Sequence, residues 1–228
     1  MERDFPRMYD TIQRLPLFLG IGVEDISDIL GHTRFDFRSY QAGHQVIAEG
    51  DVCSGLVFLI GGQLHSSVSS DDHSYQVEEV LHSPTLLQPE RLFGLTQRYT
   101  HTYTADEKCD LMMIGKDEIL RLSDTYPIFR TNLLNIITTQ AQRLWHRPWR
   151  KHPSEIRQKI LRFFSDHCDK PAGTKTFIIK MQTLSTIIGE SRLRVSQELH
   201  AMESEGLIHL TRERIKIPAM EQLFSTNP

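Results

Sequence analysis

The side chains best suited to specific chemistry lie near the C-terminus, in the segment QTLSTIIGESRLRVSQELHAMESEGLI over residues 182–208. Arg192 and Gln197 share the outward positions there with Leu193 and Ser196. An arginine fork matches the O6 and N7 acceptors of guanine, a glutamine amide matches adenine, and each such pair discriminates a base by about 1–3 kcal/mol. This segment therefore predicts recognition of base edges in duplex DNA.

Two short helices joined by a tight turn would position these side chains. Gly189 marks the turn and Ser191 is a typical N-cap for the second helix. The apolar residues that fall on the inward faces are Leu184, Ile187, Ile188, Val195, Leu199 and Met202. This is helix-turn-helix spacing, and it places Gln182, Ser191 and Arg194 where they would contact phosphate.

A purely structural pair of amphipathic helices is the alternative for this segment. Arg192 and Arg194 argue mildly against it, because cations at a helix start oppose the helix dipole. The following LIHLTRERIKIP predicts two short strands, a wing, although its turn lacks Gly, Asn or Asp. Residues 151–228 carry 12 Lys and Arg against 9 Asp and Glu, as expected of a part that meets phosphates.

The N-terminal half has a different pattern. A helix is expected within 16–31, and from residue 34 short alternating apolar segments are separated by glycines. Further strand-like segments follow at 75–81, 101–105 and 109–114, after which helical spacing returns. Short strands with glycine corners predict a rolled antiparallel sheet that ends near residue 115.

A long helix is expected over residues 126–147, YPIFRTNLLNIITTQAQRLWHR. Its apolar coverage is wide enough for two partners, the rolled sheet and a second copy of the same helix. The residues that we expect to carry the dimer are Phe129, Leu133, Ile137 and Leu144. The alternative is a helix buried wholly within one domain. Pro148 and Pro153 then predict a hinge.

Taken in this order, the chain resembles the cyclic-AMP receptor/FNR (Crp/Fnr) family of bacterial transcription regulators. The resemblance rests on YQAGHQVIAEGDVCSGLVFLIGGQL at 40–64, the helix at 126–147 and LSTIIGESRLRVSQELHAMESEGLI at 184–208. It implies an α+β fold: a cyclic-nucleotide-binding-like β-roll (a double-stranded β-helix or jelly roll) over 1–125, a dimerisation helix and hinge over 126–150, and a winged helix-turn-helix over 151–228. It also implies a homodimer on a pseudo-palindromic operator, with RNA polymerase as a further partner.

The effector pocket that the resemblance implies departs from the family's pattern. Nucleotide-binding members have a glycine-glutamate pair, followed about ten residues later by an arginine that neutralises the phosphate and by a hydroxyl residue. Here Tyr99 and Thr100 fall at the latter pair, and Glu90 fits only after a shift of one residue, behind Pro89. The other residues considered for this pocket are Arg91, Arg98 and Arg147. Cyclic AMP is therefore not the expected effector, and the effector stays unknown.

Other cofactors find no support in the sequence. The three cysteines, Cys53, Cys109 and Cys168, are too dispersed for a disulfide framework, a metal site or an iron-sulfur cluster. Four histidines of the β part leave haem open without singling out a ligand: His65, His73, His82 and His101. We expect no metal and no cofactor.

The sequence also argues against enzymes and membrane proteins. No nucleophile elbow, zinc-protease or phosphate-loop motif occurs, so we expect no enzymatic activity. No apolar run is long enough for a membrane span and the N-terminus lacks a signal peptide, so a soluble, cytoplasmic protein is expected. Two alternatives to a DNA-binding regulator remain: a cyclic-nucleotide sensor whose C-terminal part contacts protein, and a purely structural dimer.

Overall fold

A computed structural model describes residues 5–225, which form two compact units. Within the described residues, unit 1 runs to Leu64 and resumes over His82–His146. Unit 2 combines His65–Leu81 with the chain from Arg147 onward. A β-hairpin from the middle of the N-terminal half is therefore part of the C-terminal unit.

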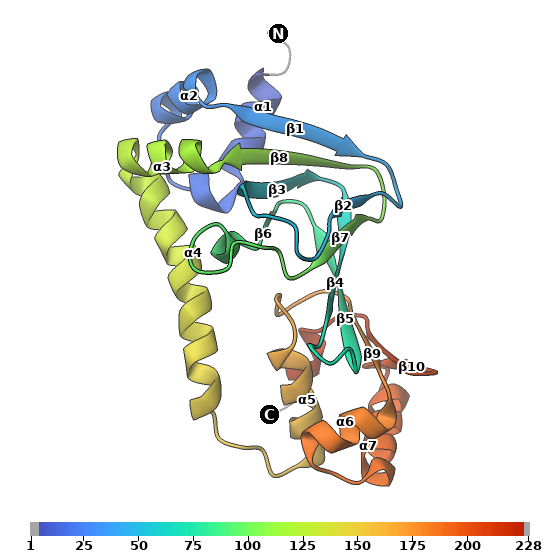
Figure 1. Ribbon diagram of the computed structural model, residues 1–228. Helices are drawn as coiled ribbons and strands as arrows, with labels where there is room; N and C mark the ends of the chain where they lie inside the picture. The colour runs from blue at the N-terminus through green and yellow to red at the C-terminus, as the bar shows by residue number, and fades with distance from the viewer. Residues whose placement is uncertain (1–4, 226–228) are drawn as a thin grey trace. The chain divides into compact units, whose positions relative to one another are not determined.

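Unit 1 is a β-roll with helices at both ends of its sequence (Figure 1). Its helical elements are α1 (Phe5–Gln13), η1 (Pro16–Phe18), α2 (Val23–His32), η2 (Pro89–Arg91), α3 (Lys116–Thr125) and α4 (Pro127–His146). Its strands are β1 (Phe35–Tyr40), β2 (Gln45–Ile47), β3 (Gly55–Gly61), the start of β4 (Gln63–Ser69), β6 (Thr85–Leu87), β7 (Thr102–Ala105) and β8 (Cys109–Gly115). One sheet has the order β1-β8-β3-β6, and β2 pairs antiparallel with β7.

A glycine makes the sharp corner between β3 and β4. Gly62 has a φ of +81°, and a Cβ on it would lie 2.5 Å from the carbonyl oxygen of Lys108. Only glycine combines that backbone conformation with so close an approach. The glycine spacing that predicted turns in the sequence is confirmed at this corner.

Aromatic side chains join the sheet to the helices in the core of unit 1. The ring of Phe18 lies 5.3 Å from that of Phe129 on α4 and 6.3 Å from that of Phe58 on β3, centroid to centroid. All three side chains are buried. Contacts of this kind add to the free energy of apolar burial, so they hold the start of α4 against the roll.

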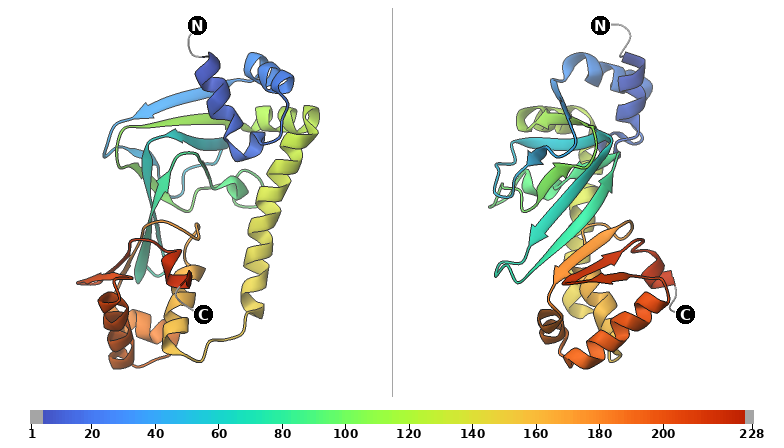
Figure 2. Two further views of the ribbon diagram at one scale, coloured as in Figure 1. Left: turned by 180° about the vertical axis from the view of Figure 1, so that it is seen from behind. Right: turned by 90° about the vertical axis from the view of Figure 1, so that its right-hand side faces the viewer.

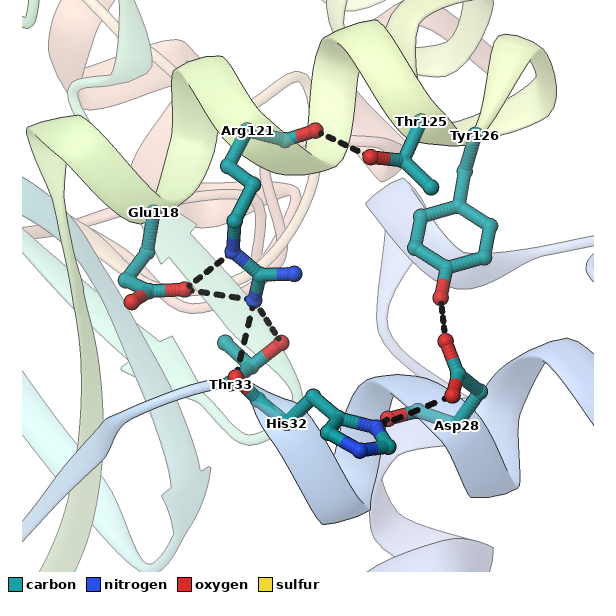
Figure 3. A network of polar contacts seen from close by, with 7 residues as sticks. All are labelled: Asp28, His32, Thr33, Glu118, Arg121, Thr125 and Tyr126. Atoms are coloured by element: carbon teal, nitrogen blue, oxygen red, sulfur yellow. Dashed lines mark hydrogen bonds and ion pairs between the residues drawn. The ribbon is translucent and has the colours of Figure 1, made fainter.

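A polar network ties α2 to α3 and to the start of α4 (Figure 3). Arg121 donates to the carboxylate of Glu118, to the hydroxyl of Thr33 at 2.9 Å and to the carbonyl oxygen of His32 at 3.1 Å. The Tyr126 hydroxyl donates to the Asp28 carboxylate. This hydrogen bond is the main reason why the pKa of Asp28 lies below its usual value.

Unit 2 contains the C-terminal helices and a sheet whose strands β5, β9, β10 and β11 pair antiparallel (Figure 2). Its elements are the hairpin of β4 and β5 (Tyr75–His82), η3 (Arg147–Trp149), α5 (Ile156–Asp166), β9 (Lys175–Ile179), α6 (Met181–Ile188), α7 (Arg192–Ser204), β10 (His209–Thr211), β11 (Arg214–Ile217) and α8 (Gln222–Ser225). The strand order here is β10-β11-β9-β5-β4. Its core joins the helices to the sheet through residues such as Phe164, Phe177, Leu184, Val195 and Leu199.

The α+β fold predicted from the sequence, a roll followed by a winged helix-turn-helix, is confirmed. The long helix occupies 127–146 within the predicted 126–147, and the wing strands are β10 and β11. In the part of the chain that the structure describes, no helix is both long and apolar enough to cross a membrane.

The Asp28–Tyr126 contact gives a testable pH dependence. A carboxyl whose pKa is depressed on folding stabilises the protein above its unfolded pKa, about 3.9, and this contribution is lost as the pH falls through the folded value. We expect Tyr126→Phe to raise the pKa of Asp28 toward its usual value and to weaken that acid-dependent loss. Carboxyl-carbon NMR titration and urea unfolding between pH 6 and pH 2 measure both quantities.

Tyr9→Phe is the matched control, because the Tyr9 hydroxyl contacts Gln13 instead. It should leave the titration of Asp28 unchanged. An unaltered Asp28 pKa in Tyr126→Phe would show that the depression has another source.

Candidate functional site

The turn between α6 and α7 is built by a glycine and a cap. Gly189 ends α6 with a φ of +67°, and its N–H reaches the carbonyl of Thr186 at 3.3 Å. Two residues later the Ser191 hydroxyl accepts from the N–H of Arg194 at 3.3 Å and caps α7. Both roles agree with those that the sequence predicts, and together they fix the direction in which α7 begins.

Helix α7 is held by one face only. Val195, Leu199 and Met202 are fully buried in the core of unit 2. Arg192, Leu193 and Gln197 are exposed on the other side, Leu193 with 68% of its surface, and Ser196 is half-buried. The structure therefore brings the four predicted base-reading residues to the start of one rigid helix.

The acidic side chains near α7 are engaged by other groups. Glu190 accepts from Lys159 at 2.6 Å and from Arg194 at 2.5 Å, and the hydrogen bond from Lys159 is the main cause that lowers the pKa of Glu190. On the later turns Arg157 forms ion pairs with Glu198 and Glu205. The first turn of α7 contains no acid, so its surface is basic.

The predicted phosphate contacts lie at the two helix starts. Gln182 is exposed in the first turn of α6, and Ser191 and Arg194 are exposed at the start of α7. The ion pair between Glu190 and Arg194 was not predicted, although their spacing of four residues is the sequence signal for such a pair. The Arg194 side chain stays 58% exposed, so a phosphate can approach it from solvent.

The wing is a β-hairpin whose tip carries charge. β10 and β11 pair from His209↔Lys216 to Thr211↔Arg214. Glu213 at the tip takes a left-handed φ of 59°, the conformation for which glycine or asparagine is usual. Arg212 and Lys216 are exposed on this hairpin and extend the basic surface of unit 2.

In the segment considered as an effector pocket, Gln88 binds Thr100. Gln88 is buried with a left-handed φ of 36°, just before Pro89 and η2. Its side chain accepts from the N–H of Thr100 at 3.0 Å and donates to the Thr100 hydroxyl at 2.7 Å. The hydroxyl that would meet a phosphate is thus already bonded within the chain. No sequence signal marked Gln88 for this role.

Tyr99 occupies the place where the resemblance implies an arginine. It is buried, and its hydroxyl donates to the carbonyl oxygen of Gly55 at 3.5 Å. Burial raises the pKa of Tyr99, and the nearby Cys53 and Glu90 raise it further. The side chain is a neutral phenol beside a carboxylate, an environment that disfavours an anionic phosphate.

The three arginines considered for this pocket each contact another group of the chain. Arg91 faces Glu90 at 3.6 Å, and Arg98 donates to the carbonyl of Gly50 at 2.7 Å. Arg147 belongs to unit 2, where its Nε lies 3.7 Å from the Asp166 carboxylate.

A cavity of about 130 Å³ lies in the roll beside Tyr99. Ile47, Val57, Leu111 and Met113 line its apolar part. Glu90, Arg91, Arg98 and Thr100 are not among the residues that line it. Among the six predicted effector residues, Tyr99 lines this cavity and the other five do not.

No cluster of metal ligands stands out in residues 5–225. No three His, Cys, Asp or Glu side chains gather there in a way that would hold a metal ion. His65 and His73 belong to unit 2, whereas His82 and His101 belong to unit 1. His101 contacts Gln88 and Thr100 through Nδ1.

The long helix α4 presents two apolar sets. Phe129 and Leu133 are buried within unit 1 itself, which the dimer assignment from sequence did not anticipate. Leu134 and Leu144 are more than half exposed, and Ile137 and Ala141 lie between them half-buried. These four, at steps of three and four residues, form the α4 stripe.

Comparison with known proteins matches both halves of the chain. Residues 37–126 match the family described as "Cyclic nucleotide-binding domain", and residues 158–225 match the "Crp-like helix-turn-helix domain". The first match covers most of the roll and the second covers α5 through the wing.

Two curated relatives are regulators of this type. The chain is 24% identical over 185 residues to the cAMP-activated global transcriptional regulator Vfr of Pseudomonas aeruginosa, covering 76% of this chain and 85% of the relative. It is 24% identical over 200 residues to the cyclic AMP receptor protein of Thermus thermophilus, covering 86% and 88%.

Solved structures agree on the fold. The catabolite activator protein of Thermus thermophilus aligns with a TM-score of 0.50 at 20% identity, over 92% of this chain and 96% of that one. The sensor domain of the transcriptional regulator DNR of Pseudomonas aeruginosa aligns with the same TM-score and identity, over 67% of this chain and 99% of that one.

The left-handed glycine of the turn can be tested by substitution. We expect Gly189→Ala to destabilise unit 2 by about 1–2 kcal/mol, because a Cβ disfavours the left-handed region. Gly189→Asn should cost less, since asparagine tolerates that region and open space surrounds the position. Urea unfolding of the three proteins measures the order; equal stabilities would show that the turn relaxes to another conformation.

Proposed function

Because the chain belongs to the Crp/Fnr family of DNA-binding transcription regulators, we propose that it acts as a homodimer that reads a pseudo-palindromic operator without a requirement for cyclic AMP. The observation that carries the proposal is the start of α7: a basic, exposed first turn on a helix whose opposite face is fully buried.

The reading residues follow from this geometry. The N-terminal residues of a recognition helix enter the major groove, where Arg192 suits guanine and Gln197 suits adenine. Leu193 suits an apolar contact such as a thymine methyl, and Ser196 is compatible with several bases. Because Leu193 suits a thymine methyl and Gln197 suits adenine, we expect the operator to include A·T pairs in each half-site.

Phosphate contacts come from Ser191, Gln182 and Arg194, which lie at the helix starts. Arg194 must exchange the Glu190 carboxylate for a phosphate, and Glu190 keeps Lys159 when it does so. Arg212 at the wing tip adds a further cation. Each phosphate neutralised in this way contributes to affinity in a salt-dependent manner, without selecting sequence.

Dimerisation is assigned to the α4 stripe. Leu134, Ile137, Ala141 and Leu144 follow the alternating three- and four-residue steps of a coiled-coil seam. The same helix uses Phe129 and Leu133 against its own roll. Two α4 helices paired along the stripe would generate the twofold symmetry that a palindromic operator requires, with recognition helices about 34 Å apart.

The roll is proposed to sense an effector other than a cyclic nucleotide, or to serve as a platform without ligand. Support comes from the buried phenol of Tyr99, the nearby Glu90 and the internal hydrogen bonds of Thr100. RNA polymerase and a cytoplasmic location belong to the proposal because transcription regulation requires them.

Selection of bound duplexes from a random DNA pool, with and without cyclic AMP at fixed salt, tests the function. We expect the same palindromic motif in both arms. A motif that appears only with cyclic AMP would overturn the conclusion that Tyr99 makes the roll unsuited to a cyclic nucleotide. The absence of any motif would favour a sensor or structural dimer that does not bind DNA specifically.

The role of Arg192 can be tested on the selected operator. Arg192→Ala should relax preference at one base pair per half-site, by about 1–3 kcal/mol for the lost contact. Fluorescence-anisotropy titrations against single-base variants of the operator measure this loss. Arg34→Ala removes an exposed arginine of unit 1 and should change nothing; unchanged preference in Arg192→Ala would remove that residue from base reading.

The α4 stripe can be tested by placing a charge on it. Leu134→Lys should shift the protein from dimer to monomer at micromolar concentration, because a lysine desolvated in an apolar seam is costly. Analytical ultracentrifugation measures the mass. Asn135→Lys adds the same charge at the adjacent exposed position of α4 and should stay dimeric; a dimeric Leu134→Lys would place the interface elsewhere.

A further inference from the structure

The DNA-binding segment contains an edge strand that is covered by a strand from the N-terminal half of the chain. Within unit 2, β5 pairs antiparallel with β9 in the register Tyr75↔Ile179, Val77↔Phe177 and Glu79↔Lys175. On its other edge β9 pairs with β11, the second strand of the wing. The sheet that carries the wing is therefore continued by the hairpin of β4 and β5.

The hairpin also enters the core under the recognition helix. Val77 is 2% exposed and belongs to the same apolar cluster as Val195 and Leu199 of α7. The ring of Tyr75 lies 5.7 Å from that of Phe163 and 5.4 Å from that of His167, both edge-on. Apolar surface of the helix-turn-helix core is thus buried by residues more than 60 positions away in sequence.

A buried charge fixes the register of this pairing. Glu79, 5% exposed, forms an ion pair with Lys175, whose side chain is fully buried. The same carboxylate accepts from the backbone N–H of Asp169 at 2.6 Å and of Lys170 at 3.3 Å. A buried carboxylate needs such partners, so any shift along the strand would leave two charges without compensation.

The neighbouring acid on the opposite face of β5 has no such role. Glu78 lies 3.6 Å from His65 of β4 and 3.5 Å from Arg214 of the wing; its side chain is 17% exposed and that of Arg214 is 52% exposed. Because Arg214 is largely in solvent, this pair contributes less to stability than the fully buried pair of Glu79 and Lys175. Glu78 and Glu79 are therefore a matched pair of acids that differ in burial.

We infer that the β4–β5 hairpin is the docking element of the DNA-binding segment: β5 completes its sheet, and Glu79, bound by Lys175 and the amides of Asp169 and Lys170, locks the register. The surface that the hairpin covers is the edge of β9 that does not pair with β11, together with the buried ammonium of Lys175. A β-strand with an acid opposite Lys175 fits this surface. In this chain that strand is β5, and the acid is Glu79.

The docking has a mechanical consequence for the helices that follow. β9 ends at Ile179 and α6 begins at Met181, so the hairpin lies one strand away from the first helix of the DNA-reading pair. The pairing of β5 with β9 therefore also fixes the strand from which α6 starts.

Cleavage of the full chain in the hinge tests the inference without DNA, so its outcome is independent of the proposed operator binding. A specific protease site is inserted after His152, in the exposed stretch before α5. After cleavage, we expect the C-terminal piece to stay bound to the N-terminal piece in gel filtration for the parent chain and for Glu78→Gln. Glu79→Gln should weaken this association roughly 100-fold or more, as expected for one partner removed from a buried ion pair.

Retention of the C-terminal piece by cleaved Glu79→Gln at parental affinity would overturn the inference, as would its immediate loss from the cleaved parent chain. If uncleaved Glu79→Gln does not fold, hydrogen exchange on the parent chain decides instead. The amides of β5 and β9 that face each other should then be protected to the same degree. Protection of β5 without β9 would show that the two strands are not docked in solution.

Discussion

The structure depends on one constraint: the helix proposed to read DNA must be held by a single face. Helix α7 meets it by burying Val195, Leu199 and Met202 and leaving its first turn in solvent. The core that receives these residues is not built from the C-terminal segment alone, because Val77 of the hairpin is part of it. The packing of α7 thus depends in part on a segment that lies in the N-terminal half of the sequence.

The free-energy cost of burying a charge bears on two features of the chain, the pairing of β5 with β9 and the interior of the roll. In unit 2, Glu79 and Lys175 are buried together, with further donors to the carboxylate, so the pairing of β5 with β9 has one register. In the roll, Tyr99 is buried as a neutral phenol whose pKa is raised by burial, at the position where the family resemblance implies an arginine. The same cost underlies both proposals, the register of the hairpin and a roll that does not require cyclic AMP.

Sequence periodicity predicted the elements of the site well. The spacing of apolar residues predicted α4 and α7 as helices. Gly189 and Ser191 were recognised by their residue types, because a left-handed turn and an N-cap each favour few residues. The assignment of partners was harder. Phe129 and Leu133 were expected at a dimer interface, yet they are buried against their own roll beside Phe18. Periodicity identifies an apolar face, but not the surface that covers it.

By itself, the sequence determined the family resemblance, the α+β fold, the helix-turn-helix and the outward residues of its second helix, because these depend on neighbours within a few turns of chain. Only the tertiary structure decided that Gln88 binds Thr100, that Glu190 holds Arg194 and Lys159 together, and that Glu79 lies opposite Lys175. The last contact joins residues 96 positions apart. Its existence depends on how two segments pack and exclude water, and no local pattern in either segment encodes the other.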